Sequence, residues 1–258
     1  MIDKTRLGIP FLDEATGGVY RNRPVLCCGR HGSGKTIFAL HCLKQAVEEG
    51  EHALLLSSWN PRDLAIVSQK TLGFSCEEAA RRGAATLLEY AGIMASPVFE
   101  QDVTLPPDSF NELVQIVEGK AVSRVILDTA LPWVAIRQKE RMAKHVFSFV
   151  QAFDRMGVTA VFTLPKPVSP QAFLLKKMLE DQIPVVITLE VGEDGTRMAT
   201  VNKYLGESVM PAPRVFDIVS GSGMVPASAK KPAATNPPPP QRKDSRAPIR
   251  FSSAFKKP

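Results

Sequence analysis

A glycine-rich octapeptide near the N-terminus constrains the fold of this chain more than any other feature. Its residues are Gly29, Arg30, His31, Gly32, Ser33, Gly34, Lys35 and Thr36. They match the pattern G-x-x-x-x-G-K-T of a phosphate-binding loop. A short apolar run, Val25–Cys28, precedes the octapeptide, and apolar residues at helical spacing, from Ile37 to Val47, follow it. This order predicts a buried strand, a tight loop and a helix, in which backbone N–H groups can surround a phosphate.

Each fixed position of the loop suits a nucleoside triphosphate with Mg²⁺. Glycines let the main chain approach the phosphates because no Cβ stands in the way. Lys35 would place a positive charge on the β- and γ-phosphates, and Thr36 would offer its hydroxyl to Mg²⁺. The helix that starts near Gly34 would direct its N-terminal dipole at the anion. The alternative, a chance glycine-rich turn, does not explain the matching flanks. We therefore predict that residues 29–36 bind ATP with Mg²⁺, although no base-reading motif separates ATP from GTP.

A second site element is an aspartate at the end of an apolar run, Ser123–Thr129. In a phosphate-loop protein the carboxyl edge of such a strand lies beside the loop, so Asp128 can hold Mg²⁺ through water. Any strand can end in aspartate, and the assignment therefore depends on the loop. We predict that Thr36 and Asp128 together form the metal side of the site.

The spacing of apolar residues predicts an α/β fold. Apolar runs alternate with amphipathic helical patterns through residue 190, which favours a mostly parallel central sheet with helices on both faces. Three closely spaced runs, near residues 184–190, 198–203 and 215–219, predict an antiparallel C-terminal extension. The 44% hydrophobic content of the 258 residues is sufficient for one large core.

The last 35 residues differ in composition from the rest. They contain eight prolines and eight basic residues against a single acid, Asp244, which accounts for the net charge of +6. We therefore expect residues 1–223 to form one folded, electrically balanced domain, and residues 224–258 to form a disordered, basic, proline-rich tail. The balanced core gives no support for a nucleic-acid-binding domain.

The tail has two candidate roles. It can be a solubilising extension, since charged runs are usually solvated. Alternatively, residues 241–258 can dock on a partner, because cations alternate there with Phe251 and Phe255. An acidic protein, single-stranded nucleic acid and a membrane surface would all suit that pattern, and the sequence does not choose among them.

Composition also excludes several classes of protein. No apolar run has the length of a membrane span, and no signal-peptide pattern follows the first residues, so we expect a cytoplasmic protein without a transmembrane segment. The four cysteines form no C-x-x-C pair and have no histidines at ligand spacing. We expect reduced, structural thiols rather than a metal centre.

Taken together, several short motifs resemble the single-domain, KaiC-like branch of the RecA superfamily of ATPases. They are Gly8-Ile9-Pro10, Leu12-Asp13, Gly17-Gly18, the loop at 29–36, Gly50-Glu51, Leu72-Gly73, the strand of Asp128 and the strand of Lys203. The resemblance covers about residues 6–222. It implies a RecA-type core that binds ATP, often at the interface between subunits of a ring or filament, and that serves timing, signalling, motility or recombination.

The chain departs from the family at the site of water activation. Family members typically carry two adjacent glutamates after the strand that follows the first helix, and one of them activates the attacking water. The corresponding residues here are Ser58 and Trp59. A missing general base predicts slow hydrolysis, unless Glu89 or Asp63 substitutes. We expect Trp59 to be a buried anchor; stacking on a base or packing against another subunit is the alternative.

A second departure concerns the contact between subunits. The family motif K-x-R-G supplies two cations to the γ-phosphate of the neighbouring subunit. Here the motif reads Lys203-Tyr204-Leu205-Gly206, which retains the lysine and loses the arginine. The resemblance implies that Lys203 makes the remaining trans contact; the alternative is an ordinary exposed lysine on a strand.

These observations lead to one main hypothesis and two alternatives. The main hypothesis is an ATP-binding, KaiC-like regulator or scaffold with weak or absent hydrolysis, assembled as a homo-oligomer, whose tail recruits a protein partner. The first alternative is an active ATPase in signalling or motility that uses a displaced carboxylate. The second is an accessory ATPase of recombination or DNA repair; the balanced charge and the short loop at 165–171, which has no clear basic or glycine-rich pattern, argue against it.

Overall fold

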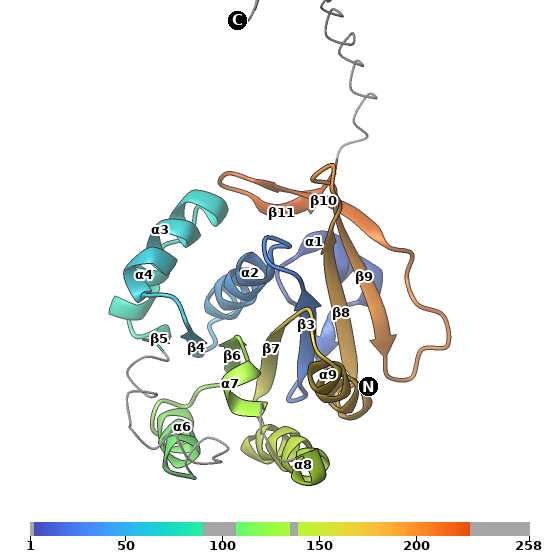
Figure 1. The fold of residues 1–258 in the computed structure, drawn as a ribbon. Coiled ribbons are helices and arrows are strands. Elements are labelled where there is room, and N and C mark those ends of the chain that lie inside the picture. Colours follow the sequence, from blue (N-terminus) through green and yellow to red (C-terminus); the bar gives the residue numbers. More distant parts are fainter. Residues whose placement is uncertain (1–2, 90–106, 135–138, 228–258) are drawn as a thin grey trace, which may run out of the picture. The chain divides into compact units, whose positions relative to one another are not determined.

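Six buried strands form the parallel centre of a nine-stranded sheet in the computed structural model, which describes residues 3–89, 107–134 and 139–227. The strands of the whole sheet lie in the order β11-β10-β9-β8-β3-β7-β6-β4-β5 (Figure 1). The parallel strands are β3 (Val25–Gly29), β4 (Ala53–Ser57), β5 (Ala85–Glu89), β6 (Arg124–Asp128), β7 (Thr159–Pro165) and β8 (Val185–Val191). Nearly continuous apolar sequence in these strands reflects burial on both faces, as parallel sheets require.

The sheet ends in an antiparallel extension, as the sequence predicts. Strand β9 (Arg197–Tyr204) pairs antiparallel with β8, β10 (Arg214–Val219) with β9, and β11 (Gly223–Pro226) with β10. The pattern of apolar runs did not identify β11, because the strand has four residues. It runs past residue 223, where we expected the folded domain to end. Residues 228–258 lie outside the described part of the chain, so the disorder of the tail stays a prediction.

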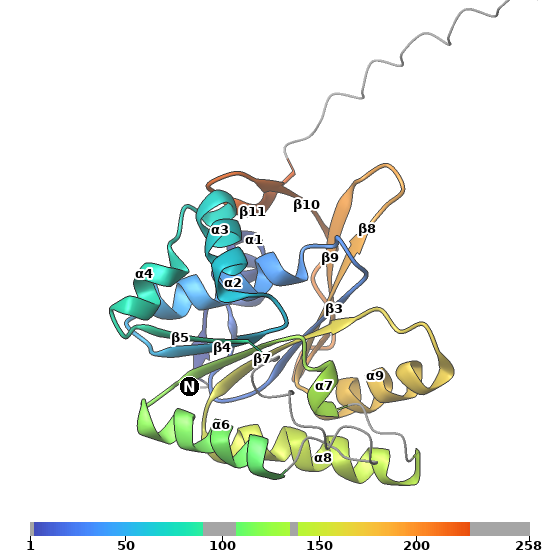
Figure 2. The same cartoon turned by 60° about the vertical axis from the view of Figure 1, so that its left-hand side comes forward.

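Helices cover both faces of the sheet, which confirms the expected architecture (Figure 2). On one face lie α1 (Pro10–Thr16), α2 (Lys35–Glu48), α3 (Pro61–Leu72) and α4 (Cys76–Arg81). On the other face lie α6 (Pro107–Gly119), α7 (Leu131–Val134), α8 (Lys139–Met156) and α9 (Pro170–Gln182). Alternate residues of β4 belong to the hydrophobic cores on the two faces of the sheet. Leu55 packs with the first set of helices, whereas Leu54 and Leu56 pack with the second.

Local signals place helix α3 after strand β4. The side chain of Asn60 caps the helix by accepting a hydrogen bond from the N–H of Arg62, and Pro61 occupies the first turn. Gly73 ends the helix with a left-handed backbone, at a φ of 60°.

A two-stranded sheet of β1 (Lys4–Thr5) and β2 (Val19–Tyr20) lies before the phosphate loop in the chain. None of the described helices is long and apolar enough to cross a membrane.

A buried histidine connects helix α2 to the last strand. The Nε2 atom of His41 accepts a hydrogen bond from the N–H of Met224 at 2.8 Å, and the ring also bonds to the backbone of Gly8. A Cβ on Gly223 would lie 2.2 Å from the same Nε2 atom, so this position needs glycine. Burial lowers the pKa of His41 to about 4. The imidazole is therefore neutral at pH 7 and acts as a structural bridge.

Acidification should weaken the fold through His41. In the unfolded chain a histidine takes up a proton near pH 6.5, whereas His41 in the native state does so only near pH 4. Its contribution is therefore fully present above pH 6.5 and is lost as the pH falls towards 4, with a cost of about 2 kcal/mol by pH 5. Urea unfolding at pH 7.5 and pH 5 measures this loss.

A His41→Gln variant provides the comparison. It should be less stable than the wild type at pH 7.5 but should lose this part of the pH dependence, whereas the exposed change His31→Gln should retain it. The carboxyl groups are common to all three proteins, so their contribution cancels in the difference. Equal pH dependence in the wild type and His41→Gln would contradict the assignment.

Candidate functional site

The predicted phosphate loop joins β3 to α2 and ends in an open helix N-terminus. Gly32 and Gly34 have positive φ angles of 76° and 104°, which other residues rarely adopt. Gly34 is the N-cap of α2 and has no side chain that could cap it. The first α-helical hydrogen bond runs from the N–H of Phe38 to the carbonyl of Gly34, at 2.8 Å. The N–H groups at the start of the helix are therefore free to bind an anion.

Asp128 receives hydrogen bonds from two neighbouring elements. Its Oδ2 atom accepts from Thr36 Oγ1 at 2.9 Å, and its Oδ1 atom accepts from Thr163 Oγ1 at 2.7 Å. The structure thus brings together Thr36 and Asp128, which the sequence assigned to the metal. Sequence reasoning missed Thr163, although a hydroxyl within the apolar strand β7 was a signal for it.

Burial and charge act in opposite directions on the two ionisable groups. Burial raises the pKa of Asp128, and the hydrogen bonds from Thr163 and Thr36, with the positive charge of Lys35, oppose this. Burial lowers the pKa of Lys35, and nearby groups that include Asp128 oppose this shift. The Nζ atom of Lys35 donates to the carbonyl of Arg30 at 2.9 Å. The lysine is therefore folded back over its own loop.

These groups line a cavity of about 430 Å³, which we call the loop cavity. Lys35, Thr36, Asp128 and the helix N-terminus provide a cation, a hydroxyl, a carboxylate and backbone N–H groups, the set that suits a triphosphate with Mg²⁺. Within the described residues no cluster of three or more acidic, histidine or cysteine side chains could hold a metal ion by itself. Mg²⁺ would therefore need the phosphate oxygens as ligands, which is its usual mode of binding.

Ser58 and Trp59 also line the loop cavity. The N–H of Ser58 donates to the carbonyl of Asp128 at 3.2 Å, so Ser58 and Trp59 lie close to Asp128 in the site. Trp59 is 42% exposed, and the expectation of a buried anchor is therefore wrong. Trp59 follows a turn after β4 in which its N–H donates to Ser57 Oγ at 3.1 Å.

The two acids that could replace a missing general base lie elsewhere. Glu89 ends the edge strand β5, where Asn60 Nδ2 approaches its Oε2 at 3.5 Å. Asp63 is exposed in the first turn of α3. Neither lines the loop cavity, and among the described residues that do, Asp128 is the sole carboxylate.

The remaining residues predicted to bind nucleotide do not all line the loop cavity. His31 and Gly32 line the loop cavity, whereas Gly29 and Arg30 line a second cavity on the other side of the loop. Ser33 is buried, and its Oγ fills the space that a Cβ on Gly29 would need. No pattern in the sequence indicated Ile218, which reaches the loop cavity from strand β10.

Lys203 binds within its own chain in this structure. It lies on β9, and its Nζ donates to the carbonyls of Glu180 and Asp181 at 2.6 and 3.1 Å. These carbonyls belong to the last turn of α9, where a positive charge is favourable. The contact to a neighbouring subunit stays a prediction.

Comparisons with known proteins agree on one family. Residues 5–230 match the family model described as "ATPase: KaiC". The circadian clock proteins KaiC3 and KaiC2 of a Synechocystis strain are 22% and 28% identical over 87% and 79% of this chain. The chain spans 45% and 36% of their lengths, so it covers less than half of either protein.

Two further similarities involve proteins of comparable length. A UPF0273 protein of Aeropyrum pernix is 26% identical over 67% of this chain and 72% of its own. The crystal structure of a KaiC-like protein from Pyrococcus horikoshii covers 88% of this chain and 100% of its own, with a TM-score of 0.70 at 21% identity. At that identity the structural similarity establishes the fold alone.

The hydrogen bond from Thr163 should matter for ligand binding that depends on Mg²⁺. A Thr163→Val variant keeps the shape of the side chain but leaves Asp128 with one fewer donor. We expect it to weaken ATP binding in the presence of Mg²⁺ about tenfold, the usual scale for removing a group that orients a metal-binding carboxylate. Thr163→Ser, which keeps the hydroxyl, should bind like the wild type. Isothermal titration with and without Mg²⁺ measures both; equal loss in the two variants would contradict this role.

Proposed function

Because the chain belongs to the KaiC family of ATPases, we propose that it is an ATP-binding regulatory or scaffold protein with weak or absent hydrolysis. Family membership makes it a nucleotide-binding protein of the KaiC/RecA type. The finer assignment rests on one observation in the loop cavity: the described lining has residues suited to hold a triphosphate but no carboxylate suited to activate water.

Binding and hydrolysis need different groups. In the proposed complex Lys35 and the N-terminus of α2 hold the phosphates, and Thr36 and Asp128 hold Mg²⁺, which would neutralise phosphate charge. Hydrolysis further needs a group that orients the attacking water and accepts its proton. Asp128 is poorly suited to accept the proton, because in the proposed complex its carboxylate, held by Thr36 and Thr163, would face Mg²⁺, whose positive charge opposes protonation. The serine hydroxyl and the indole at positions 58 and 59 are not bases at neutral pH.

We propose that nucleotide lies at a subunit interface, as the family resemblance implies. Exposed apolar side chains, either in the lining of the loop cavity or next in sequence to lining residues, support this. Trp59 is 42% exposed, and Ile66 and Val219, on α3 and β10, are 55% and 44% exposed. A neighbouring subunit could cover this surface and gain the free energy of apolar burial. Lys203 would contribute to the neighbouring site only after leaving the carbonyls of Glu180 and Asp181.

The tail completes the proposal as a docking segment. Residues 241–258 combine cations with Phe251 and Phe255, a pattern that suits an acidic protein surface. Nucleotide bound between subunits would then act as a structural ligand, and its presence would decide how many tails are displayed together.

Turnover measurements test the central claim. The wild-type protein should bind ATP with Mg²⁺ but release phosphate close to the background rate. A Ser58→Glu, Trp59→Glu double variant should hydrolyse ATP about 10²- to 10⁴-fold faster, the usual contribution of a general base. Adding Lys35→Ala to the double variant should abolish both binding and turnover.

Two results would overturn the proposal in different ways. Absence of ATP binding in the wild type would remove the nucleotide from the function. Rapid wild-type turnover would instead indicate an active ATPase with a displaced carboxylate, and Glu89→Gln and Asp63→Asn would then identify it by which one loses the activity.

A further inference from the structure

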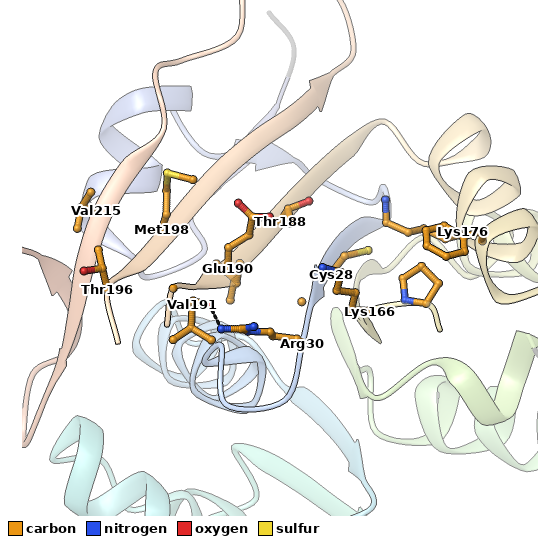
Figure 3. Close-up of a pocket in the computed structure, with 15 residues that line it drawn as sticks. Cys28, Arg30, Lys166, Lys176, Thr188, Glu190, Val191, Thr196, Met198 and Val215 are labelled. Carbon is orange, nitrogen blue, oxygen red and sulfur yellow. Dashed lines mark hydrogen bonds between the residues drawn. The ribbon is translucent and has the colours of Figure 1, made fainter. Parts of the chain in front are cut away.

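A second cavity lies on the opposite side of the phosphate loop. Its volume is about 560 Å³, within the range of small-molecule sites, and it shares no lining residue with the loop cavity. We call it the hairpin cavity, because strands β8 and β9 form one of its walls. Figure 3 shows Thr196, Met198 and Val215 on one side and Lys176 on the other, with Arg30 and Lys166 between them.

The wall of the hairpin cavity is largely apolar. Phe173 and Val215 are 57% and 46% exposed, although side chains of this kind are usually buried. Met198 and the buried Pro167 extend the same surface. Phe173 belongs to α9 and Val215 to β10, so elements far apart in the sequence converge on this surface. It would suit the apolar body of a ligand rather than a hydrated ion.

The charges around the hairpin cavity are mostly positive. Arg30, Lys166 and Lys176 line it, against one acid, Glu190. Lys176 already pairs with Glu180 on its own helix. Within the described residues the ammonium group of Lys166 has no hydrogen bond or ion pair. The guanidinium of Arg30 donates to the backbone carbonyl of Val191. Two cations therefore remain available for a negatively charged group.

We propose that the hairpin cavity binds a small organic anion with an apolar or aromatic body. Lys166 and Arg30 hold the anionic group, and Phe173 and Met198 contact the body. The basic tail of this chain is a poor occupant, because its cations would face those of the cavity. The inference goes beyond the proposed function, since it concerns residues that do not line the nucleotide site.

The cavity is connected to the phosphate loop through two backbone carbonyls. The carbonyl of Gly29 accepts a hydrogen bond from the N–H of Lys166, and that of Arg30 accepts from Lys35 Nζ, both at 2.9 Å. An anion beside Arg30 would also lower the positive potential that the loop offers to phosphates. We therefore expect the anion and ATP to weaken each other's binding, by the same factor in both directions.

A fluorescent anion tests the site directly. The probe is 8-anilinonaphthalene-1-sulfonate, which has an aromatic body and one sulfonate, titrated into the native full-length chain. We expect Lys166→Gln and Phe173→Ala each to weaken its binding about five- to tenfold, as expected for losing one charged or one apolar contact. The matched controls are Lys177→Gln, an exposed lysine on α9, and Phe147→Ala, an exposed phenylalanine on α8; neither should change dye binding.

Further arms separate the alternatives. The uncharged analogue N-phenyl-1-naphthylamine should bind more weakly than the anion, and both cavity variants should bind ATP like the wild type. Saturating ATP with Mg²⁺ should weaken dye binding without abolishing it.

Three results would overturn the proposal. Equal loss of binding in the control variants would mean non-specific dye binding. Complete displacement by ATP, with no effect of the cavity variants, would place the dye in the loop cavity. Dye binding that falls as the protein self-associates would identify a second copy of the chain as the occupant. If the wild type binds no ATP, the proposed function fails. The dye titrations would still decide whether the hairpin cavity binds an anion.

Discussion

The carboxylate of Asp128 joins three elements, and the arrangement of the loop cavity depends on it. Strand β6 carries the aspartate, α2 carries Thr36, and β7 carries Thr163, so two hydrogen bonds fix the loop helix against two parallel strands. This geometry is possible because parallel strands end at the same edge of a sheet, where the loop after β3 also lies. The same bonds hold the carboxylate in one orientation, which in the proposed complex would suit a metal ion.

The opposite end of β6 is also fixed, by a buried cation. Arg124 is 1% exposed and lies within 2.9 Å of Glu51 and 3.4 Å of Glu49. It also donates to Thr5 Oγ1 at 2.6 Å, which connects the N-terminal strand to the base of the sheet. Removing this cation would take one partner from each of two partly buried carboxylates, although Glu51 would keep its ion pair with Arg21. Strand β6 therefore presents Asp128 from a fixed position.

The proposed site, which would bind nucleotide with little catalysis, would have a definite physical use. A ligand that binds only the folded or assembled state stabilises that state in proportion to the logarithm of its concentration. Nucleotide held by Lys35, Thr36 and Asp128 would thus report its concentration as a degree of assembly. The hairpin cavity would add a second input, because it meets the same loop from the other side through Gly29 and Arg30. Both effects act through binding free energies and need no hydrolysis.

The sequence alone determined the loop, its flanking strand and helix, the pairing of Thr36 with Asp128, and the parallel sheet with its antiparallel extension. These follow from local spacing, since glycine positions and apolar periodicity are set along the chain.

Only the tertiary structure decided which side chains meet. Thr163 reaches Asp128 and Ile218 reaches the loop cavity from strands far along the chain, and Phe173, Met198 and Val215 form the hairpin cavity from three separate elements. It also turned Trp59 outward and engaged Lys203 within its own chain. Such contacts arise from strand order and register, which one-dimensional patterns do not encode.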